Sequence, residues 1–195
     1  MDILSNLFGT EARVKLMRLF LFNPNNIFET KEAAIRTKLR LPIVKREINS
    51  LEKSSLIKRK SLKVKKRRIK GWYLNPEFPH LAPLQNLLIH TDSIDPDSVL
   101  KKFSKIGRLK VVVVAGVFIQ DWDSRADLLV VADRIKGRAL ENIMKKLEAE
   151  IGKEMKYVAL ETSEFQYRLN FGDKLLRDIL DYPHKVLLDK FGNLS

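Results

Sequence analysis

The sequence predicts an α+β protein in two parts, a helical N-terminal part that ends in a β-hairpin and a C-terminal part built on a small mixed sheet. Apolar residues recur at helical spacing through residues 10–53 and then alternate with polar residues up to residue 74. Beyond residue 108, short apolar strands alternate with helical segments. The charge is also uneven, because residues 1–80 hold 19 Lys and Arg against seven acids, whereas residues 81–195 are nearly neutral. A basic module joined to a neutral one indicates a partner that is a polyanion.

Composition narrows the classes of protein to which the chain can belong. Its 195 residues are 45% hydrophobic and 31% charged, which is typical of folded globular proteins. The absence of cysteine excludes disulfides and thiolate metal sites. No apolar run approaches the roughly 20 residues that span a bilayer, and the first residues lack the basic region of a signal peptide. We therefore expect a cytoplasmic protein with no membrane contact, no metal and no cofactor.

Three helices and a hairpin are predicted in the N-terminal part. The helices are expected at residues 10–22, 31–37 and 42–53. Thr10 and Thr30 are the expected N-caps of the first two, and Pro42 suits the first turn of the third. Alternation over residues 56–60 and 68–74 predicts the hairpin, which has a basic tip. Three helices followed by a hairpin make a winged helix-turn-helix.

Prolines mark the expected domain boundary. Pro76, Pro79 and Pro83 interrupt the chain after the hairpin, so we place the boundary near residue 80. Residues 1–80 then form the winged helix, and residues 81–195 form a second domain.

The N-terminal part resembles winged-helix transcriptional regulators. Residues 44–52 (VKREINSLE), followed by residues 55–57 (SLI), are similar to the recognition helix and first wing strand of that group. Residues 7–16 (LFGTEARVKL) resemble its first helix, so the resemblance covers about residues 5–80. The sequence departs from the group at Leu41, where a small polar cap is usual.

The basic residues of this part are the candidates for contact with double-stranded DNA. Lys45, Arg46 and Asn49 lie opposite the apolar face of the third helix, and an α-helix fits the major groove, where such side chains donate to base edges. From residue 53 to residue 70 the chain has ten basic residues and no acid, which favours contacts with phosphates. The expected phosphate contacts are Lys53, Lys63, Lys65, Lys66, Arg67, Arg68 and Lys70. Trp72 and Tyr73 are assigned to packing rather than to base stacking.

Strands and helices alternate through the second part. The predicted strands are residues 109–115, 126–132, 155–160 and 185–188. The predicted helices are residues 84–90, 95–105, 138–151, 163–169 and 174–180. An irregular loop over residues 116–125 separates the first two strands. This order indicates a small mixed sheet with helices packed on it.

The second part resembles minimal nucleotidyltransferases of the polymerase-beta type. In that family one strand ends in Gly-Ser and an Asp-x-Asp pair opens the next, a pattern similar to residues 111–131 (VVVVAGVFIQDWDSRADLLVV). Residues 155–164 and 172–178 resemble the corresponding pieces of homologues that join this domain to a winged helix. The resemblance implies a nucleotidyltransferase-like α/β domain, in which carboxylates hold divalent ions against a nucleoside triphosphate.

Three positions of the family's catalytic site are altered here. Gly116 matches the glycine, but Val117 stands in place of the serine. Asp127 matches the second Asp, whereas Arg125 stands in place of the first, and the third carboxylate falls near Lys156. Two cations at a metal site repel a metal, so we interpret the site as degenerate and Asp127 as structural. Arg125 and Lys156 leave open a nucleotide phosphate or another anion bound without metal.

Two functions remain after these comparisons. The first is a DNA-binding transcriptional regulator, not an enzyme, whose degenerate second domain serves as a sensor or interaction module. The alternative is an active nucleotidyltransferase that uses the winged helix to locate a nucleic-acid or protein substrate. The altered site favours the first. The sequence does not identify the operator or the effector, and both a monomer and a homodimer are compatible with it.

Overall fold

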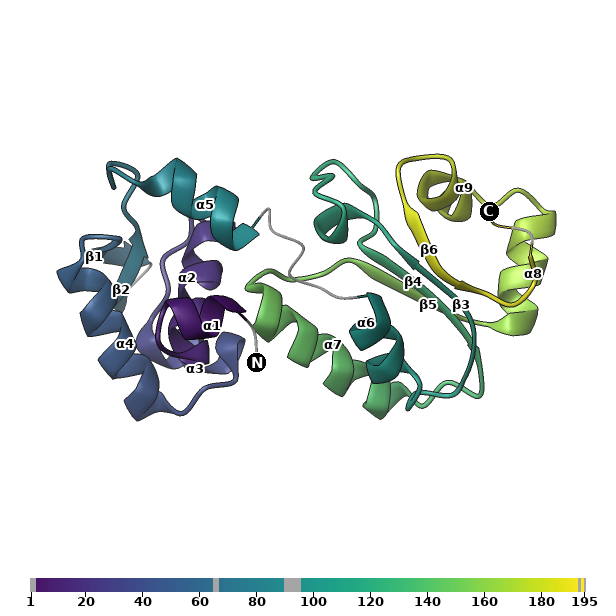
Figure 1. Ribbon diagram of the computed structural model, residues 1–195, viewed down its shortest axis with the longest axis horizontal. Helices are drawn as coiled ribbons and strands as arrows, with labels where there is room; N and C mark the ends of the chain where they lie inside the picture. Colours follow the sequence, from purple (N-terminus) through teal and green to yellow (C-terminus); the bar gives the residue numbers. More distant parts are fainter. Residues whose placement is uncertain (1–2, 65–66, 90–95, 193, 195) are drawn as a thin grey trace. The chain divides into compact units, whose positions relative to one another are not determined.

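A computed structural model of the chain describes residues 3–64, 67–89, 96–192 and 194. It has the predicted α+β class, with helices and two small sheets (Figure 1). The chain divides into two compact units. The first comprises Met1–Ser93 and Lys145–Lys153, and the second comprises Ile94–Met144 and Glu154–Ser195. The first unit thus runs past the expected boundary near residue 80 and includes the end of a helix from much later in the chain.

Helices and one hairpin build the first unit. Its elements are α1 (Ile3–Leu7), α2 (Glu11–Phe22), α3 (Thr30–Thr37), α4 (Leu41–Lys53), β1 (Ile57–Val64), β2 (Arg67–Leu74) and α5 (Leu81–Ile89). β1 and β2 pair antiparallel, with Ile57 opposite Leu74. Phe28 adds a short bridge to β2 through two hydrogen bonds with Trp72, each 2.9 Å long.

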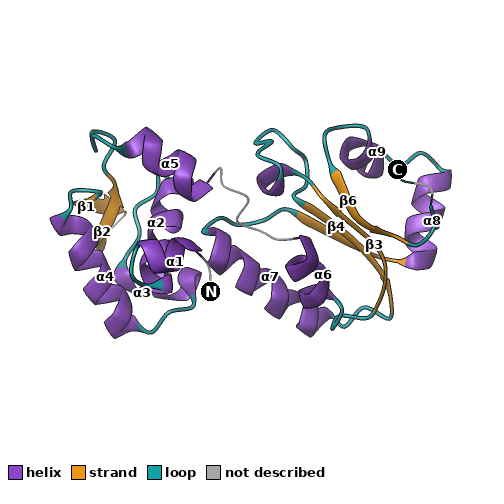
Figure 2. Ribbon diagram, in the orientation of Figure 1, coloured by secondary structure: helices purple, strands orange, loops and turns teal. Residues whose placement is uncertain are grey.

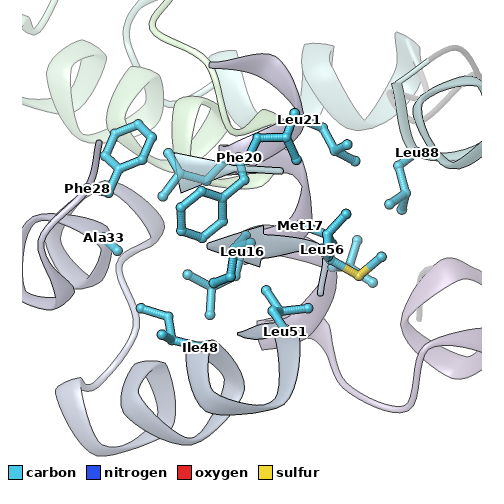
Figure 3. Packing of buried hydrophobic residues seen from close by; sticks show 14 of the residues in the cluster. Leu16, Met17, Phe20, Leu21, Phe28, Ala33, Ile48, Leu51, Leu56 and Leu88 are labelled. Carbon is cyan, nitrogen blue, oxygen red and sulfur yellow. The ribbon is translucent and has the colours of Figure 1, made fainter. Parts of the chain in front are cut away.

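Helix α2 lies at the centre of the first unit's core. It begins at Glu11 because the side chain of Thr10 accepts a hydrogen bond from the backbone N–H of Arg13, at 3.1 Å, as predicted for an N-cap. Figure 3 shows Leu16, Phe20 and their neighbours meeting side chains from α3 and α4, and Leu56 just before β1. Burying each large apolar side chain contributes about 1.5–3 kcal/mol, so this face of α2 positions the helices around it.

A buried arginine on α2 joins the ends of two other helices. Arg18 is only 6% exposed. Its Nε donates to the carbonyl of Leu88 in α5 at 3.2 Å, and its Nη1 donates to the carbonyl of Glu150 at 3.2 Å, near the end of α7 (Gly137–Ile151). Both carbonyls lie in the last turn of a helix, where a cation interacts favourably with the helix dipole.

The second unit is a four-stranded mixed sheet with helices on its faces (Figure 2). Besides the start of α7, its elements are α6 (Pro96–Phe103), β3 (Arg108–Val114), the 3-10 turn η1 (Gly116–Phe118), β4 (Leu128–Asp133), β5 (Tyr157–Glu161), α8 (Thr162–Asn170), α9 (Lys174–Leu180) and β6 (Lys185–Asp189). The strand order is β5-β4-β3-β6, with β5 parallel to β4 and the other pairs antiparallel. Val111 and Val113 face a core formed with α8 and α9, and both are fully buried.

The sequence predictions differ from the structure at a few element ends. Helix α1 was not predicted, and α5 begins at Leu81, three residues before the expected start. Thr30 is the first residue of α3 and not its cap, because Glu29 occupies the cap position without a side-chain hydrogen bond. None of the helices in the described ranges is long and apolar enough to cross a membrane.

Gly152 packs closely against the backbone of α2, and a substitution there tests this packing. Gly152 has φ of +87°, and a Cβ there would lie 2.6 Å from both the carbonyl carbon of Arg18 and the backbone nitrogen of Leu19. We expect Gly152→Ala to lower the free energy of unfolding by about 1–3 kcal/mol from overpacking, in addition to the roughly 1–2 kcal/mol that a left-handed backbone costs. Urea unfolding is followed by Trp72 fluorescence in a Trp122→Phe background.

Gly9→Ala is the matched control, because Gly9 lies in the same unit and also has a positive φ, of +88°, but the nearest atom to an added Cβ is Nη1 of Arg13 at 4.0 Å. It carries the backbone cost alone. Equal losses in the two variants would contradict the close packing of Gly152 on α2.

Candidate functional site

Helix α4 presents the predicted base-contacting residues on one exposed stripe. Successive residues of an α-helix are about 100° apart, so Lys45, Arg46, Asn49 and Lys53 fall within about 100° of one another around the axis. All four are exposed. The opposite face is buried through Val44, Glu47, Ile48 and Leu51. The structure thus brings together the four polar residues that the sequence assigned to this helix.

An ion pair between the buried Glu47 and the partly exposed Arg13 fixes this stripe relative to α2. Glu47 is 2% exposed, and its carboxylate accepts a hydrogen bond from Nε of Arg13 at 2.9 Å. Nη1 of Arg13 also donates to the carbonyl of Phe8 at 3.1 Å. A buried carboxylate is costly unless it is paired and hydrogen-bonded, so α4 is held with Glu47 against Arg13 and its cationic stripe outward. Arg46 also reaches Glu47, at 3.3 Å, while its side chain stays 72% exposed.

The stripe borders a hollow in the surface of the first unit. Its lining residues are Thr10, Arg13, Arg46, Glu47, Asn49, Ser50 and Lys53. Arg13 is a residue that sequence reasoning missed, because nothing in the local pattern connects it with Glu47, 34 positions away. Three cations and one carboxylate leave the hollow with positive charge.

Part of the basic charge of the β1–β2 hairpin is neutralised by acids from outside the hairpin. Lys58 lies 2.6 Å from Glu77, and Arg59 lies 3.1 Å from Glu52. The hydrogen bond between Lys58 and Glu77 raises the pKa of the lysine and lowers the pKa of the glutamate. Residues 53–70 contain ten basic residues and no acid, but at least two of these cations are paired with acids from other parts of the chain. The unpaired charge of the segment is therefore smaller than the sequence alone indicates.

Aromatic residues of β2 lie beneath two of the cations. The guanidinium of Arg59 is 5.4 Å from the ring centroid of Trp72, and the ammonium of Lys60 is 5.4 Å from that of Tyr73. Trp72 is partly buried against the core of the unit. These contacts favour a packing role for both rings, as the sequence suggested.

The other predicted wing contacts are described to different extents. Lys70 is exposed on β2. The backbones of Lys63, Arg67 and Arg68 belong to the paired strands. Lys65 and Lys66 lie outside the described residues.

In the second unit, Asp127 directs both carboxylate oxygens at the backbone. It is 6% exposed. Oδ1 accepts from the N–H of Val117 at 2.8 Å, and Oδ2 accepts from the N–H of Lys156 at 2.8 Å. The backbone N–H of Asp127 in turn donates to the carbonyl of Lys156. One side chain thus ties the turn after β3 to the start of β5.

Gly116 makes room for this carboxylate. Its φ is +53°, and a Cβ there would lie 2.2 Å from Oδ1 of Asp127. Any side chain at residue 116 would displace Asp127. Val117, Asp127 and Lys156 are therefore joined by hydrogen bonds, and Gly116 packs against the carboxylate that joins them.

The cations of the predicted site do not converge on Asp127. The side chain of Arg125 is 71% exposed, and its Nε lies 3.9 Å from the carboxylate of Asp178. Lys156 joins the cluster through its backbone, and its side chain is exposed. Asp178 partly neutralises the cation that a bound anion would need. Within the described ranges, no three His, Asp or Glu side chains are grouped so as to hold a metal ion.

No protein-family model, curated protein or solved structure matches the chain. The site is accordingly interpreted from its own geometry.

The two hydrogen bonds of Asp127 predict a structural role without metal. In Asp127→Asn only one amide oxygen remains to accept, so one backbone N–H loses its partner, and we expect a loss of about 1–3 kcal/mol in the free energy of unfolding. Urea unfolding followed by Trp122 fluorescence in a Trp72→Phe background measures it. Asp123→Asn, in the exposed loop before β4, is the control, with an expected change within about 0.5 kcal/mol.

Urea unfolding with and without Mg²⁺ tests the alternative that Asp127 is a metal ligand. An ion bound at 100 times its Kd would stabilise the fold by about 2.7 kcal/mol. We expect equal wild-type midpoints in millimolar Mg²⁺ and in EDTA. A midpoint raised by Mg²⁺ in wild type but not in Asp127→Asn would make Asp127 a metal ligand.

Proposed function

We propose that the chain is a DNA-binding transcriptional regulator whose winged helix-turn-helix lies in the first unit. The exposed stripe of Lys45, Arg46, Asn49 and Lys53 on α4 is the observation that carries this proposal. The helix is amphipathic, its buried face is anchored in the core, and its outward face has three cations and an amide. A cytoplasmic location is part of the proposal.

The chemistry of the stripe fits the major groove of duplex DNA. Lys and Arg donate to O6 and N7 of guanine, and Asn pairs with N6 and N7 of adenine. The hairpin beside α4 adds a dense row of basic residues, which suits contacts with phosphates. In this arrangement α4 selects the sequence and the wing contributes affinity.

The second unit, in this proposal, is a nucleotidyltransferase-like domain without catalysis that serves as a sensor or interaction module. Both oxygens of Asp127 are used by backbone N–H groups, which supports a structural role. Phosphoryl transfer depends on metals that stabilise charge and position the phosphates. Arg125 adds a permanent positive charge two residues before that carboxylate.

Salt dependence and sequence preference together test the DNA-binding role. Replacing Lys65, Lys66, Arg67 and Arg68 by Gln is expected to weaken binding to all duplexes and to flatten the slope of log affinity against log salt by about 0.9 for each lost phosphate contact. Asn49→Ala is expected to change the preferred sequence, at a cost of roughly 1–3 kcal/mol in discrimination. Duplex selection followed by titration at several salt concentrations measures both.

The two variants serve as controls for each other. An unchanged salt slope in the wing variant would remove the wing from the binding surface. A wild-type set of selected sites in Asn49→Ala, and also in Arg46→Ala, would contradict the role of α4.

A transfer assay tests the second unit. Incubation with labelled nucleoside triphosphates in Mg²⁺ or Mn²⁺ is expected to leave protein and nucleic acid unlabelled, since only one of the three ligand carboxylates of an active member has a counterpart here, Asp127. Label incorporated by wild type and lost in folded Asp127→Asn, as judged by circular dichroism, would establish an enzyme and overturn this part of the proposal.

A further inference from the structure

Helix α6 of the second unit carries a stripe of lysines on its solvent face. Ser98, Lys101, Lys102 and Lys105 follow one another at i, i+3, i+4 and i+7, which places them along one side of the helix and the turn after it. They line a common hollow. The opposite side is anchored in the core, with Val99, Phe103 and Ile106 each at most 1% exposed.

Basic residues outnumber acids in this part of the sequence. Asp95 and Asp97 precede the stripe, and from Ser98 to Gln120 there are five basic residues and no acid. Lys101 and Lys105 are exposed, and in the part of the chain that the structure describes neither ammonium group has an ion-pair partner. The unit as a whole is nearly neutral, so three lysines within five residues are a local excess of positive charge.

We propose that the α6 stripe (Ser98, Lys101, Lys102 and Lys105) is a second nucleic-acid contact that binds the phosphates of duplex DNA. The helical part of the stripe, from Ser98 to Lys102, spans about 6 Å, and Lys105 extends the stripe into the turn after the helix. One strand of a duplex presents a phosphate charge about every 3.4 Å of axis. The lysines therefore face about three phosphates of one strand.

The residue types select the phosphate backbone over other anionic partners. Lysine is a compact point charge on a flexible stem, which suits phosphates without reading sequence. The stripe has no arginine fork for bidentate recognition of a phosphopeptide and no aromatic ring for base stacking. Its ligand is thus a regular row of phosphates.

The inference relies on the proposed function only for the identity of the duplex. The winged helix and the α6 stripe belong to different units of one chain. If both contact the same duplex, binding of one raises the effective concentration of the other. The full chain then binds the duplex more tightly than the first unit alone would, and its sequence preference stays the same.

The test uses the full chain and two variants with equal loss of charge. Lys101→Gln with Lys105→Gln removes two cations from the stripe, and Lys174→Gln with Lys185→Gln removes two exposed cations from α9 and β6. The slope of log affinity against log salt for the selected duplex is expected to flatten by about 1.8 in the stripe variant. In the control variant it should stay as in wild type. Equal effects in both variants, or none in the stripe variant, would overturn the inference.

Lysine footprinting separates this inference from the proposed function. Acetylation of the chain with and without duplex, read by mass spectrometry, is expected to show protection of Lys101 and Lys105 but not of Lys174 and Lys185. Protection at α6 with none in the wing or α4 would retain the stripe and refute the winged-helix contact. Protection in the wing alone would retain the proposed function and refute the stripe.

Discussion

The hydrogen bonds of the Arg18 guanidinium are the interaction that joins α2 to the ends of α5 and α7 in the first unit. Arg18 is a buried residue of α2, and its guanidinium donates to carbonyls in the last turns of α5 and α7, 62 residues apart in sequence. Asn23 reinforces the same junction by donating to the carbonyl of Gly152 at 2.8 Å. A buried cation needs hydrogen-bond acceptors. The carbonyls at a helix end lack partners within the helix, so Arg18 and the two helix ends satisfy each other's hydrogen bonds. This reciprocity explains why residues 145–153 belong to the first unit although the chain reaches them late.

The same principle sets the direction of α4. Glu47 lies among Val44, Ile48 and Leu51 on the buried face, a position that an unpaired carboxylate would destabilise. Arg13 makes the position tolerable, and it stands on α2, whose own apolar face packs on α4. The ion pair therefore contributes less to net stability than to the choice of one rotation for α4. That rotation exposes the residues proposed to read DNA.

Local pattern predicted most elements but few of the contacts between them. The range 174–180 was predicted to the residue, because Asp173 supplies a local cap to Leu176 and the apolar spacing is clear. Helix α1 was missed because five residues give too little periodicity. The pairing of Arg59 with Glu52 and of Lys58 with Glu77, and the place of Gly152 against α2, depend on residues brought together by folding. No period in the sequence encodes such contacts.

The predicted transferase-like site shows how sequence and structure inform each other. The resemblance to nucleotidyltransferases marked Gly116 and Asp127 as two separate matches, one to the glycine at the end of a strand and one to the second Asp of the pair. The structure joins them in a single interaction, since the missing Cβ of residue 116 leaves the space that Oδ1 of Asp127 fills. A carboxylate in this position keeps the turn after β3 attached to the start of β5 without the help of another acid. Structural need alone is then sufficient to retain both residues, so their presence is no argument for catalysis.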